Sequence, residues 1–332
     1  MTRKFVLGTL LAAGTLSMTV AAFQPPAAPA PMVVEAEKLK DNLWVMKGGG
    51  GNSAVFLTAE GVTVVDTKLP GWGKPLLDKI KTVTDKPVTM IINTHVHPDH
   101  NGTNSYFKAA RPTVEVVTHV NTKKWVDMNP KADPAWQPTQ TFADKKTIGQ
   151  GKDQIDLYYF GAGHTDGDAF VVFKDLRAMC IGDLMAWNMA PLIDRATMGS
   201  VIALPDTLEK AIKGIKNVDL VIEGHGNVNS WNGLKAYAEF NRALLNVAAA
   251  SLKKGETPEQ ALAELEKNKK LAVFLGEELL KDLEYGGTPK SRALININVA
   301  YRELKGEPEP ARGGGPARGA APPAVPGPGA GR

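Results

Sequence analysis

Three histidines and an aspartate stand within six consecutive residues of this chain, in the stretch HVHPDH. They are His95, His97, Asp99 and His100, and the whole sequence holds only six histidines. Imidazole and carboxylate together are the ligands that a borderline metal ion such as zinc prefers. A single histidine is usually a surface or packing residue, but this density of ligand types is hard to explain without a metal. The stretch therefore predicts a metal site.

Three more candidate ligands each follow an apolar, strand-like run and stand next to a glycine. They are His164 in GAGHTDGD, Asp183 in CIGDLM and His225 in IEGHGN. A neighbouring glycine lets the backbone bend sharply and carry a side chain toward a shared centre. We expect these residues to meet the first cluster, and we interpret the remaining histidine, His119, as a surface or packing residue.

The elements that must position these residues occur in two batches. Short β-branched runs separated by Gly, Asn or Asp fill residues 32–67, and the apolar run 87–94 leads directly into the histidine stretch. A second β-rich block occupies 155–182, and residues 231–304 have the apolar spacing of helices. Two β-rich halves, each followed by helices, predict a layered α/β sandwich rather than a regularly alternating parallel fold.

The ordered set HxHxDH, GH, GD and GHG resembles the metallo-β-lactamase superfamily over roughly residues 35–230. The resemblance implies a four-layer αββα sandwich with a pair of metal ions at one edge, between the two sheets. It also implies a role for each ligand: one ion held by His95, His97 and His164, the second by Asp99, His100 and His225, and Asp183 bridging the two. Asp66, which ends a strand in VVDTK, matches a family aspartate that supports the histidine loop from behind. A plain turn or cap aspartate is the other interpretation of Asp66.

Two zinc ions at such a site would hold a hydroxide and polarise a carbonyl or phosphoryl oxygen, which is the chemistry of hydrolysis. Asp99 is then the candidate catalytic residue, because its carboxylate can steer the nucleophile and pass a proton to the leaving group. The zinc β-lactamases carry a cysteine or serine where this chain has Asp183, whereas thioester hydrolases, lactonases and phosphodiesterases of the superfamily carry an aspartate. Cys180 stands three residues too early to replace it and is interpreted as a buried strand thiol.

The expected function is therefore hydrolysis of a small ester, thioester, lactone or β-lactam. A phosphodiesterase and a mononuclear iron oxidoreductase of the dioxygenase kind stay open as alternatives, with iron in place of zinc in the second case. A metal-binding module without turnover is disfavoured by the complete ligand set. The glycine-rich stretch 47–56 predicts either a mobile hairpin over the metals or a tight turn.

Both ends of the chain differ in composition from the rest. A basic start, an apolar stretch and the small residues at 20–22 predict a cleaved signal peptide and hence a periplasmic or secreted protein. The last residues are almost all Gly, Pro, Ala and Arg, which cannot bury a core. The predicted plan is a signal peptide (1–22), a linker (23–34), a catalytic domain (35–230), a helical extension packed on it (231–305) and a disordered tail (306–332).

The net charge of the chain is +4. Without Arg3 and Lys4 at the start, and without the three arginines and two glutamates of 306–332, it falls to +1. No basic cluster stands out, so a nucleic-acid partner is not expected. A small-molecule substrate is expected, with no membrane contact after signal cleavage, and the sequence makes no prediction of oligomeric state.

Overall fold

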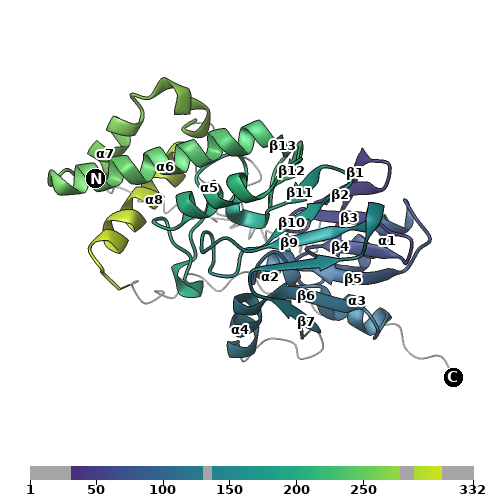
Figure 1. Ribbon diagram of the computed structural model, residues 1–332. Coiled ribbons are helices and arrows are strands. Elements are labelled where there is room, and N and C mark those ends of the chain that lie inside the picture. The colour runs from purple at the N-terminus through teal and green to yellow at the C-terminus, as the bar shows by residue number, and fades with distance from the viewer. Residues whose placement is uncertain (1–30, 130–136, 277–287, 309–332) are drawn as a thin grey trace, which may run out of the picture. The chain divides into compact units, whose positions relative to one another are not determined.

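The computed structural model of the 332-residue chain describes residues 31–129, 137–276 and 288–308 (Figure 1). The chain divides into two compact units, Met1–Pro31 and Met32–Arg332, and every described helix and strand belongs to the second. The predicted signal peptide, most of the linker and nearly all of the predicted tail lie outside the described residues. Within the described residues, no helix is both long enough and apolar enough to span a bilayer.

The first sheet contains seven strands in the order β1-β2-β3-β4-β5-β6-β7. Its first four strands pair antiparallel, and β4, β5, β6 and β7 pair parallel. The strands are β1 (Glu35–Lys40), β2 (Leu43–Lys47), β3 (Ser53–Leu57), β4 (Val62–Val65), β5 (Val88–Ile92), β6 (Glu115–His119) and β7 (Gln140–Phe142).

The second sheet contains six strands in the order β13-β12-β11-β10-β9-β8. All neighbours pair antiparallel except β11 and β12, which run parallel. The strands are β8 (Lys145–Ile148), β9 (Ile155–Tyr158), β10 (Phe170–Phe173), β11 (Ala178–Cys180), β12 (Leu220–Ile222) and β13 (Val228–Ser230).

Three apolar clusters hold the layers together. The middle cluster lies between the sheets, where Phe56 of β3 and Phe173 of β10 pack with their ring centroids 5.0 Å apart. On the outer face of the first sheet, Leu76 and Ile80 stand one helical turn apart and pack with Phe107 against that sheet. These residues belong to α1 (Gly73–Lys81) and α3 (Asn104–Ala110). Two further helices, α2 (Pro98–Asn101) and α4 (Val120–Met128), follow β5 and β6 along the chain.

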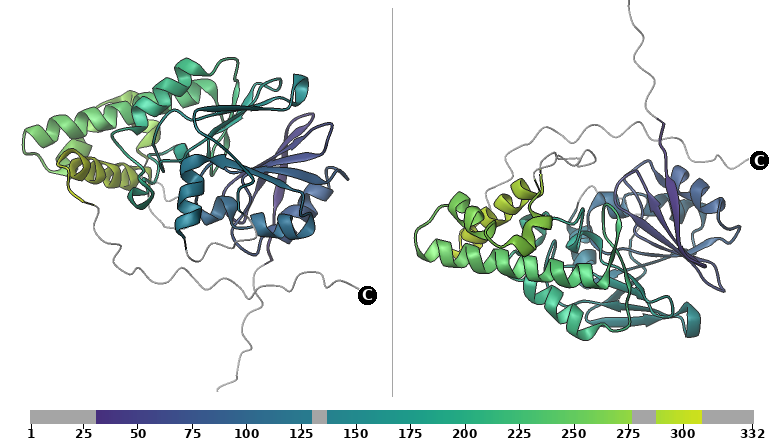
Figure 2. Two further views of the ribbon diagram at one scale, coloured as in Figure 1. Left: turned by 60° about the horizontal axis from the view of Figure 1, so that its bottom comes forward. Right: turned by 90° about the horizontal axis from the view of Figure 1, so that it is seen from above.

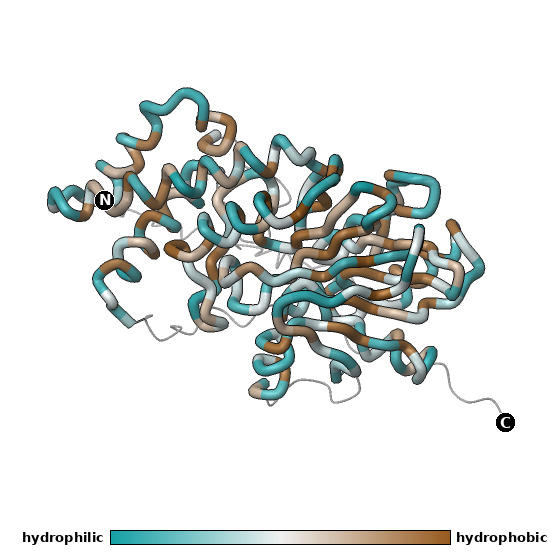
Figure 3. The backbone as a smooth tube through the Cα atoms, viewed as in Figure 1, coloured by the Kyte–Doolittle hydropathy of each residue, from teal (hydrophilic) through white to brown (hydrophobic). Residues whose placement is uncertain are grey.

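The second sheet is covered by four helices whose apolar faces contribute to the largest cluster. Figure 2 shows them, in green and yellow, on the side away from the first sheet. In Figure 3 brown, hydrophobic segments follow the strands and recur along these helices. The helices are α5 (Leu204–Gly214), α6 (Trp231–Lys253), α7 (Pro258–Leu265) and α8 (Pro289–Leu304). The predicted four-layer αββα sandwich is confirmed.

Local sequence explains where the last helices begin. The Ser230 side chain caps α6, and Thr257 and Thr288 each open a capping box followed by a proline, an arrangement that satisfies the first free backbone N–H groups. Helix α6 starts directly after β13 and packs against α5, α7 and α8. The predicted boundaries at residues 230 and 305 stay predictions.

Candidate metal centre

The histidine loop follows β5, which ends at Ile92 in the buried middle of the first sheet. His97 caps the short helix α2 with an extended backbone, and Pro98 stands at its first position. Helix α2 therefore places Asp99 and His100 in its first turn, next to His95 and His97 on the preceding loop. The loops after β4 and β5 leave the same edge of the first sheet because these strands run parallel, and the loops after β11 and β12 leave one edge of the second sheet for the same reason.

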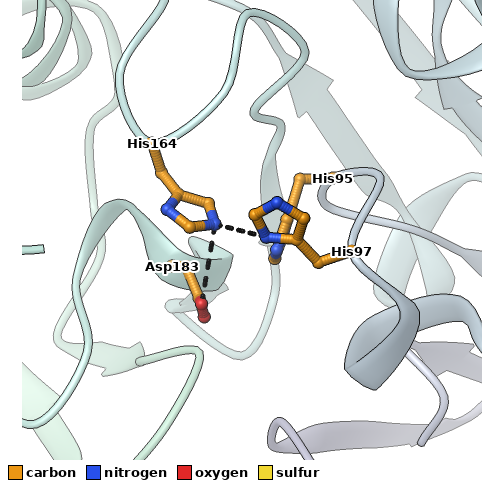
Figure 4. Close-up of side chains that lie close together, drawn as sticks. All are labelled: His95, His97, His164 and Asp183. Carbon is orange, nitrogen blue, oxygen red and sulfur yellow. Dashed lines mark hydrogen bonds and ion pairs between the residues drawn. The ribbon is translucent and has the colours of Figure 1, made fainter. Parts of the chain in front are cut away.

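One cluster is formed by residues that are distant in sequence. The ligand atoms of His95, His97, His164 and Asp183 all lie within 4.8 Å of one another (Figure 4). His164 Nε2 lies 2.8 Å from His97 Nδ1 and 3.6 Å from Asp183 Oδ2. The structure thus brings together three histidines that were predicted to share one ion.

A second cluster adjoins the first and contains Asp99, His100 and His225. His225 Nε2 lies 3.1 Å from Asp99 Oδ2 and 3.3 Å from His100 Nε2. The other oxygen of Asp183, Oδ1, lies 3.2 Å from His100 Nε2 and 3.6 Å from His225 Nε2. Asp183 therefore presents one oxygen to each cluster.

The donor set fits a metal ion. Two pairs of imidazole nitrogens face each other at 2.8 and 3.3 Å, although at most one nitrogen of a neutral pair can donate a hydrogen bond. His95 Nε2 and Asp183 Oδ1 are buried and have no hydrogen-bond partner among the described residues. Buried polar atoms are normally satisfied, so lone pairs converging in this way indicate a site for cations.

Burial keeps two of these imidazoles neutral, which is the form that binds metals. It lowers the pKa of His164 to about 4, with a further contribution from nearby His97. Burial also lowers the pKa of His95 well below its usual value, assisted by His100 and His164. Burial opposes ionisation of Asp183, but His225 and His100 outweigh it and lower the pKa of that carboxyl well below its usual range. His95 and His164 thus supply neutral nitrogens and Asp183 an ionised oxygen, whereas the carboxylates of Asp183, Asp99 and Asp66 outweigh burial and raise the pKa of His100 well above its usual value.

Asp66 supports the second cluster from behind, where it was predicted. Its Oδ2 accepts from the Thr94 hydroxyl at 2.6 Å and lies 2.8 Å from His100 Nδ1, while Oδ1 accepts from Thr94 N at 2.7 Å. A proton held on His100 Nδ1 leaves Nε2 as the free lone pair. Asp66 also adopts a left-handed backbone, with a φ of 59°, and is 2% exposed. Its contacts agree with the predicted supporting position behind His100, and its role there stays a prediction.

Each histidine of the first cluster is also held through the ring nitrogen that does not face the cluster. His97 Nε2 lies 2.8 Å from Asp194 Oδ2, His164 Nδ1 contacts the carbonyl of Leu192, and His95 Nδ1 lies 3.0 Å from the Thr94 hydroxyl. Sequence reasoning missed Asp194. It lies on the irregular segment between β11 and α5, where no strand end or ligand spacing marks it.

The glycine-rich stretch joins β2 to β3 and lies directly against the centre. Gly48, Gly49 and Gly50 have φ values of 93°, 72° and 110°, a region that favours glycine. Gly51 N donates to the carbonyl of Asp99 at 3.1 Å, and a Cβ added at Gly51 would lie 2.2 Å from His100 Cε1. This connection, the glycine turn, packs on the predicted ligands Asp99 and His100.

A Gly51→Ala protein is expected to bind zinc about 10- to 100-fold more weakly, because the new methyl group must displace the His100 ring. Competition with a chromophoric chelator measures this affinity. The control is Gly276→Ala, whose added Cβ would have its nearest neighbour at 3.9 Å. Equal zinc affinities for the two variants would show that the glycine turn does not restrain His100.

A second residue that sequence reasoning missed, Lys68, anchors this turn. Its side chain is fully buried, and Nζ donates to the carbonyls of Met46 at 2.6 Å and Gly51 at 2.5 Å. Burial lowers the pKa of Lys68 to about 7, although Asp66 and Asp99 act in the opposite direction. The hydrogen bonds to these two carbonyls offset the cost of burying the polar end of Lys68 inside the fold.

This pKa predicts a pH-dependent stability. Between pH 7 and 10.5 the unfolded chain keeps the proton on Lys68 while the folded protein loses it, so raising the pH favours the folded state. We expect the difference in unfolding free energy between the metal-free native protein and Lys68→Met to rise by about 1 kcal/mol per pH unit over this range. Urea denaturation at pH 7.5, 8.5 and 9.5 measures it, with the exposed Lys152→Met as control. A difference that does not change with pH would contradict the lowered pKa of Lys68 in the folded protein.

Comparisons with known proteins agree with this geometry. Residues 46–225 match the family described as the metallo-beta-lactamase superfamily. A metallo-beta-lactamase type 2 of Elizabethkingia meningoseptica is 28% identical over 207 residues, which are 58% of this chain and 78% of that protein. Metallo-beta-lactamase IND-1 of Chryseobacterium indologenes is 26% identical, covering 63% and 87%.

A solved metallo-beta-lactamase from Pontibacter korlensis superposes with a TM-score of 0.56 at 23% identity, over 63% of this chain and 99% of that one. This likeness shows the shared fold. The family match covers more than half of the chain and spans every predicted ligand from His95 to His225. This chain belongs to the metallo-beta-lactamase superfamily and is a metal-dependent hydrolase.

Proposed function

We propose that the protein is an exported dinuclear zinc hydrolase that acts on a small carbonyl substrate, namely an ester, thioester, lactone or β-lactam. The observation that carries this proposal is the position of Asp183. Its two oxygens face two adjacent clusters, each of which contains enough nitrogen and oxygen donors for an ion. A carboxylate in this position supports two ions rather than one.

Two zinc ions held there would supply a water of lowered pKa and an electrophile for the substrate carbonyl oxygen. The first ion would be held by His95, His97 and His164. The second ion would be held by Asp99, His100 and His225, and Asp183 would bind both ions. The histidine-rich donor set supports zinc, since oxygen-only sites favour magnesium or calcium.

Asp99 is suited to move the proton. Its side chain is 19% exposed, and its Oδ2 lies 3.1 Å from His225 Nε2. Burial opposes ionisation, but His100 and His225 lower the pKa of Asp99 below its usual range, so the group is a carboxylate at neutral pH. Asp99 Oδ2 can therefore accept a proton from an attacking water and deliver it to the departing group.

Export rests on the N-terminal sequence alone, where a basic start precedes an apolar stretch and small residues. Expression of the full chain followed by cell fractionation and mass spectrometry tests it. A periplasmic protein beginning near residue 23 would support export. An uncleaved protein in the cytoplasm would contradict it.

The hydrolase is tested with a panel that contains a neutral aryl ester, a thioester, a lactone and a chromogenic cephalosporin. Zinc-loaded protein should hydrolyse at least one compound well above the rate with zinc alone, and removal of zinc by a chelator should abolish this activity. The exposed Asp175→Ala is the control for protein quality. A protein confirmed to hold two zinc ions that hydrolyses none of the four would contradict the proposal.

A further inference from the structure

A segment between β11 and α5 connects the metal centre to the C-terminal helix. We call residues 194–201 the Asp194 segment, because Asp194 begins it and its carboxylate lies 2.8 Å from His97 Nε2. The segment also contacts Glu303 near the end of α8, the yellow helix in Figure 1. Helix α8 lies outside the family match, which ends at residue 225, so membership of the family does not explain this contact.

Asp194 has two roles at the start of the segment. Its Oδ2 faces His97, while its Oδ1 accepts from Ala196 N at 3.1 Å and so caps the 3-10 turn η4 (Arg195–Thr197). The Asp194 N–H donates to the carbonyl of His164 at 2.8 Å. The direction of the Asp194 carboxylate therefore depends on how this turn is held.

The Glu303 carboxylate holds the turn through three hydrogen bonds. Its Oε1 accepts from Arg195 Nη1 at 2.8 Å and from Ser200 Oγ at 2.5 Å. Its Oε2 accepts from Val201 N at 2.9 Å. Arg195 Nη1 also donates to the carbonyl of Gly199 at 2.6 Å, which closes the segment on itself. The Glu303 side chain is only 10% exposed, so water competes little with these charge-assisted bonds.

Helix α8 does not depend on Glu303 for its attachment. Ala293, Ile297 and Ala300 are fully buried on this helix and belong to the largest apolar cluster. The helix also packs against α6 and α7. Loss of the Glu303 carboxylate should therefore leave α8 in place while it releases the turn that directs Asp194.

We propose that Glu303 is a positioning residue of the metal centre, which holds the Asp194 segment and thereby fixes the orientation of the His97 imidazole. His97 Nδ1 faces the first cluster, and a proton held on Nε2 by Asp194 leaves Nδ1 as the free lone pair. This inference goes beyond the proposed hydrolase, because it gives the C-terminal helix a role at the centre. It depends on His97 as a metal ligand and not on the substrate or on the number of ions.

Chelator competition and nuclear magnetic resonance of the zinc-loaded protein test this proposal. A Glu303→Ala protein should bind zinc about 3- to 30-fold more weakly. The native protein should show a slowly exchanging His97 Nε2 proton, because Asp194 accepts from it, and this signal should be lost in Glu303→Ala. The chain has only six histidines, which makes the signal assignable.

The control is Ile297→Val, which deletes a buried methylene group from the same helix. It should lower the unfolding free energy in urea but leave the zinc affinity and the His97 signal as in the native protein. Glu303→Gln keeps the size of the side chain and one acceptor oxygen, so its zinc affinity should lie between those of the native protein and Glu303→Ala. This variant decides the question if the alanine protein does not fold.

A double-mutant cycle with Asp194→Ala tests whether Glu303 acts through Asp194. In that background Glu303→Ala should lower zinc affinity by less than about twofold, since the carboxylate that it directs is already gone. An equal loss of affinity in both backgrounds would overturn the assignment. So would native zinc affinity with an unchanged His97 signal in the Glu303 variants. Neither measurement requires turnover, so a protein that binds zinc as described but hydrolyses no substrate would count against the proposed hydrolase alone.

Discussion

Replacing Asp183 by alanine is expected to reduce kcat/KM by about 10²- to 10³-fold and to lower the zinc content from two ions per chain toward one. The side chain lies between His164 on one side and His100 and His225 on the other, at 3.2 to 3.6 Å. Its removal takes an oxygen from both predicted ion sites at once. It also removes a negative charge that separates two cations, so the second ion should be lost first.

Metal analysis by mass spectrometry and steady-state kinetics measure this effect together. Asp175→Ala, in the exposed turn between β10 and β11, should keep both zinc ions and full activity. An Asp183→Ala protein that retains two zinc ions and most of its kcat/KM would show that this carboxylate does not bridge the clusters.

The second large effect is expected at Asp66. An Asp66→Ala protein leaves the Thr94 amide, the Thr94 hydroxyl and His100 Nδ1 without their acceptor inside the protein. Unpaired buried donors cost about 1–3 kcal/mol each, so the unfolding free energy should fall by about 3 kcal/mol or more. Alanine also tolerates the left-handed backbone at this position poorly.

Asp66→Asn separates the two roles of this residue. Asparagine adopts the left-handed backbone readily and can still accept from Thr94, but its amide cannot accept both hydrogen bonds that Oδ2 now takes. This variant should be destabilised less than Asp66→Ala, yet bind zinc about 10- to 100-fold more weakly than the native protein. Urea denaturation and chelator competition measure the two quantities. Native zinc affinity in Asp66→Asn would refute its role behind His100.

The histidine cluster could be predicted because its ligands are local in sequence. His95 to His100 lie within six residues, so their proximity requires only that a loop follow the strand ending at Ile92. His164, Asp183 and His225 were predicted because each follows an apolar run and stands beside a glycine. The structure places all three at the same sheet edge, and their roles as ligands stay predictions.

The sequence did not indicate the groups that hold these ligands. Asp194 lies on an irregular segment, and its contact with His97 joins residues 97 positions apart. Lys68 is a charged residue whose burial depends on two carbonyls that converge only after folding. The strands β8 and β13 were missed for a related reason. They are short edge strands with few apolar residues, so no periodic pattern marks them.

Anomalous diffraction at the zinc edge tests most directly whether two zinc ions share Asp183 between the two histidine clusters. Crystals of the zinc-loaded protein should show two anomalous peaks, one among His95, His97 and His164 and the other among Asp99, His100 and His225. Both peaks should adjoin the Asp183 carboxylate. A single peak, or a second peak away from Asp183, would contradict the dinuclear site.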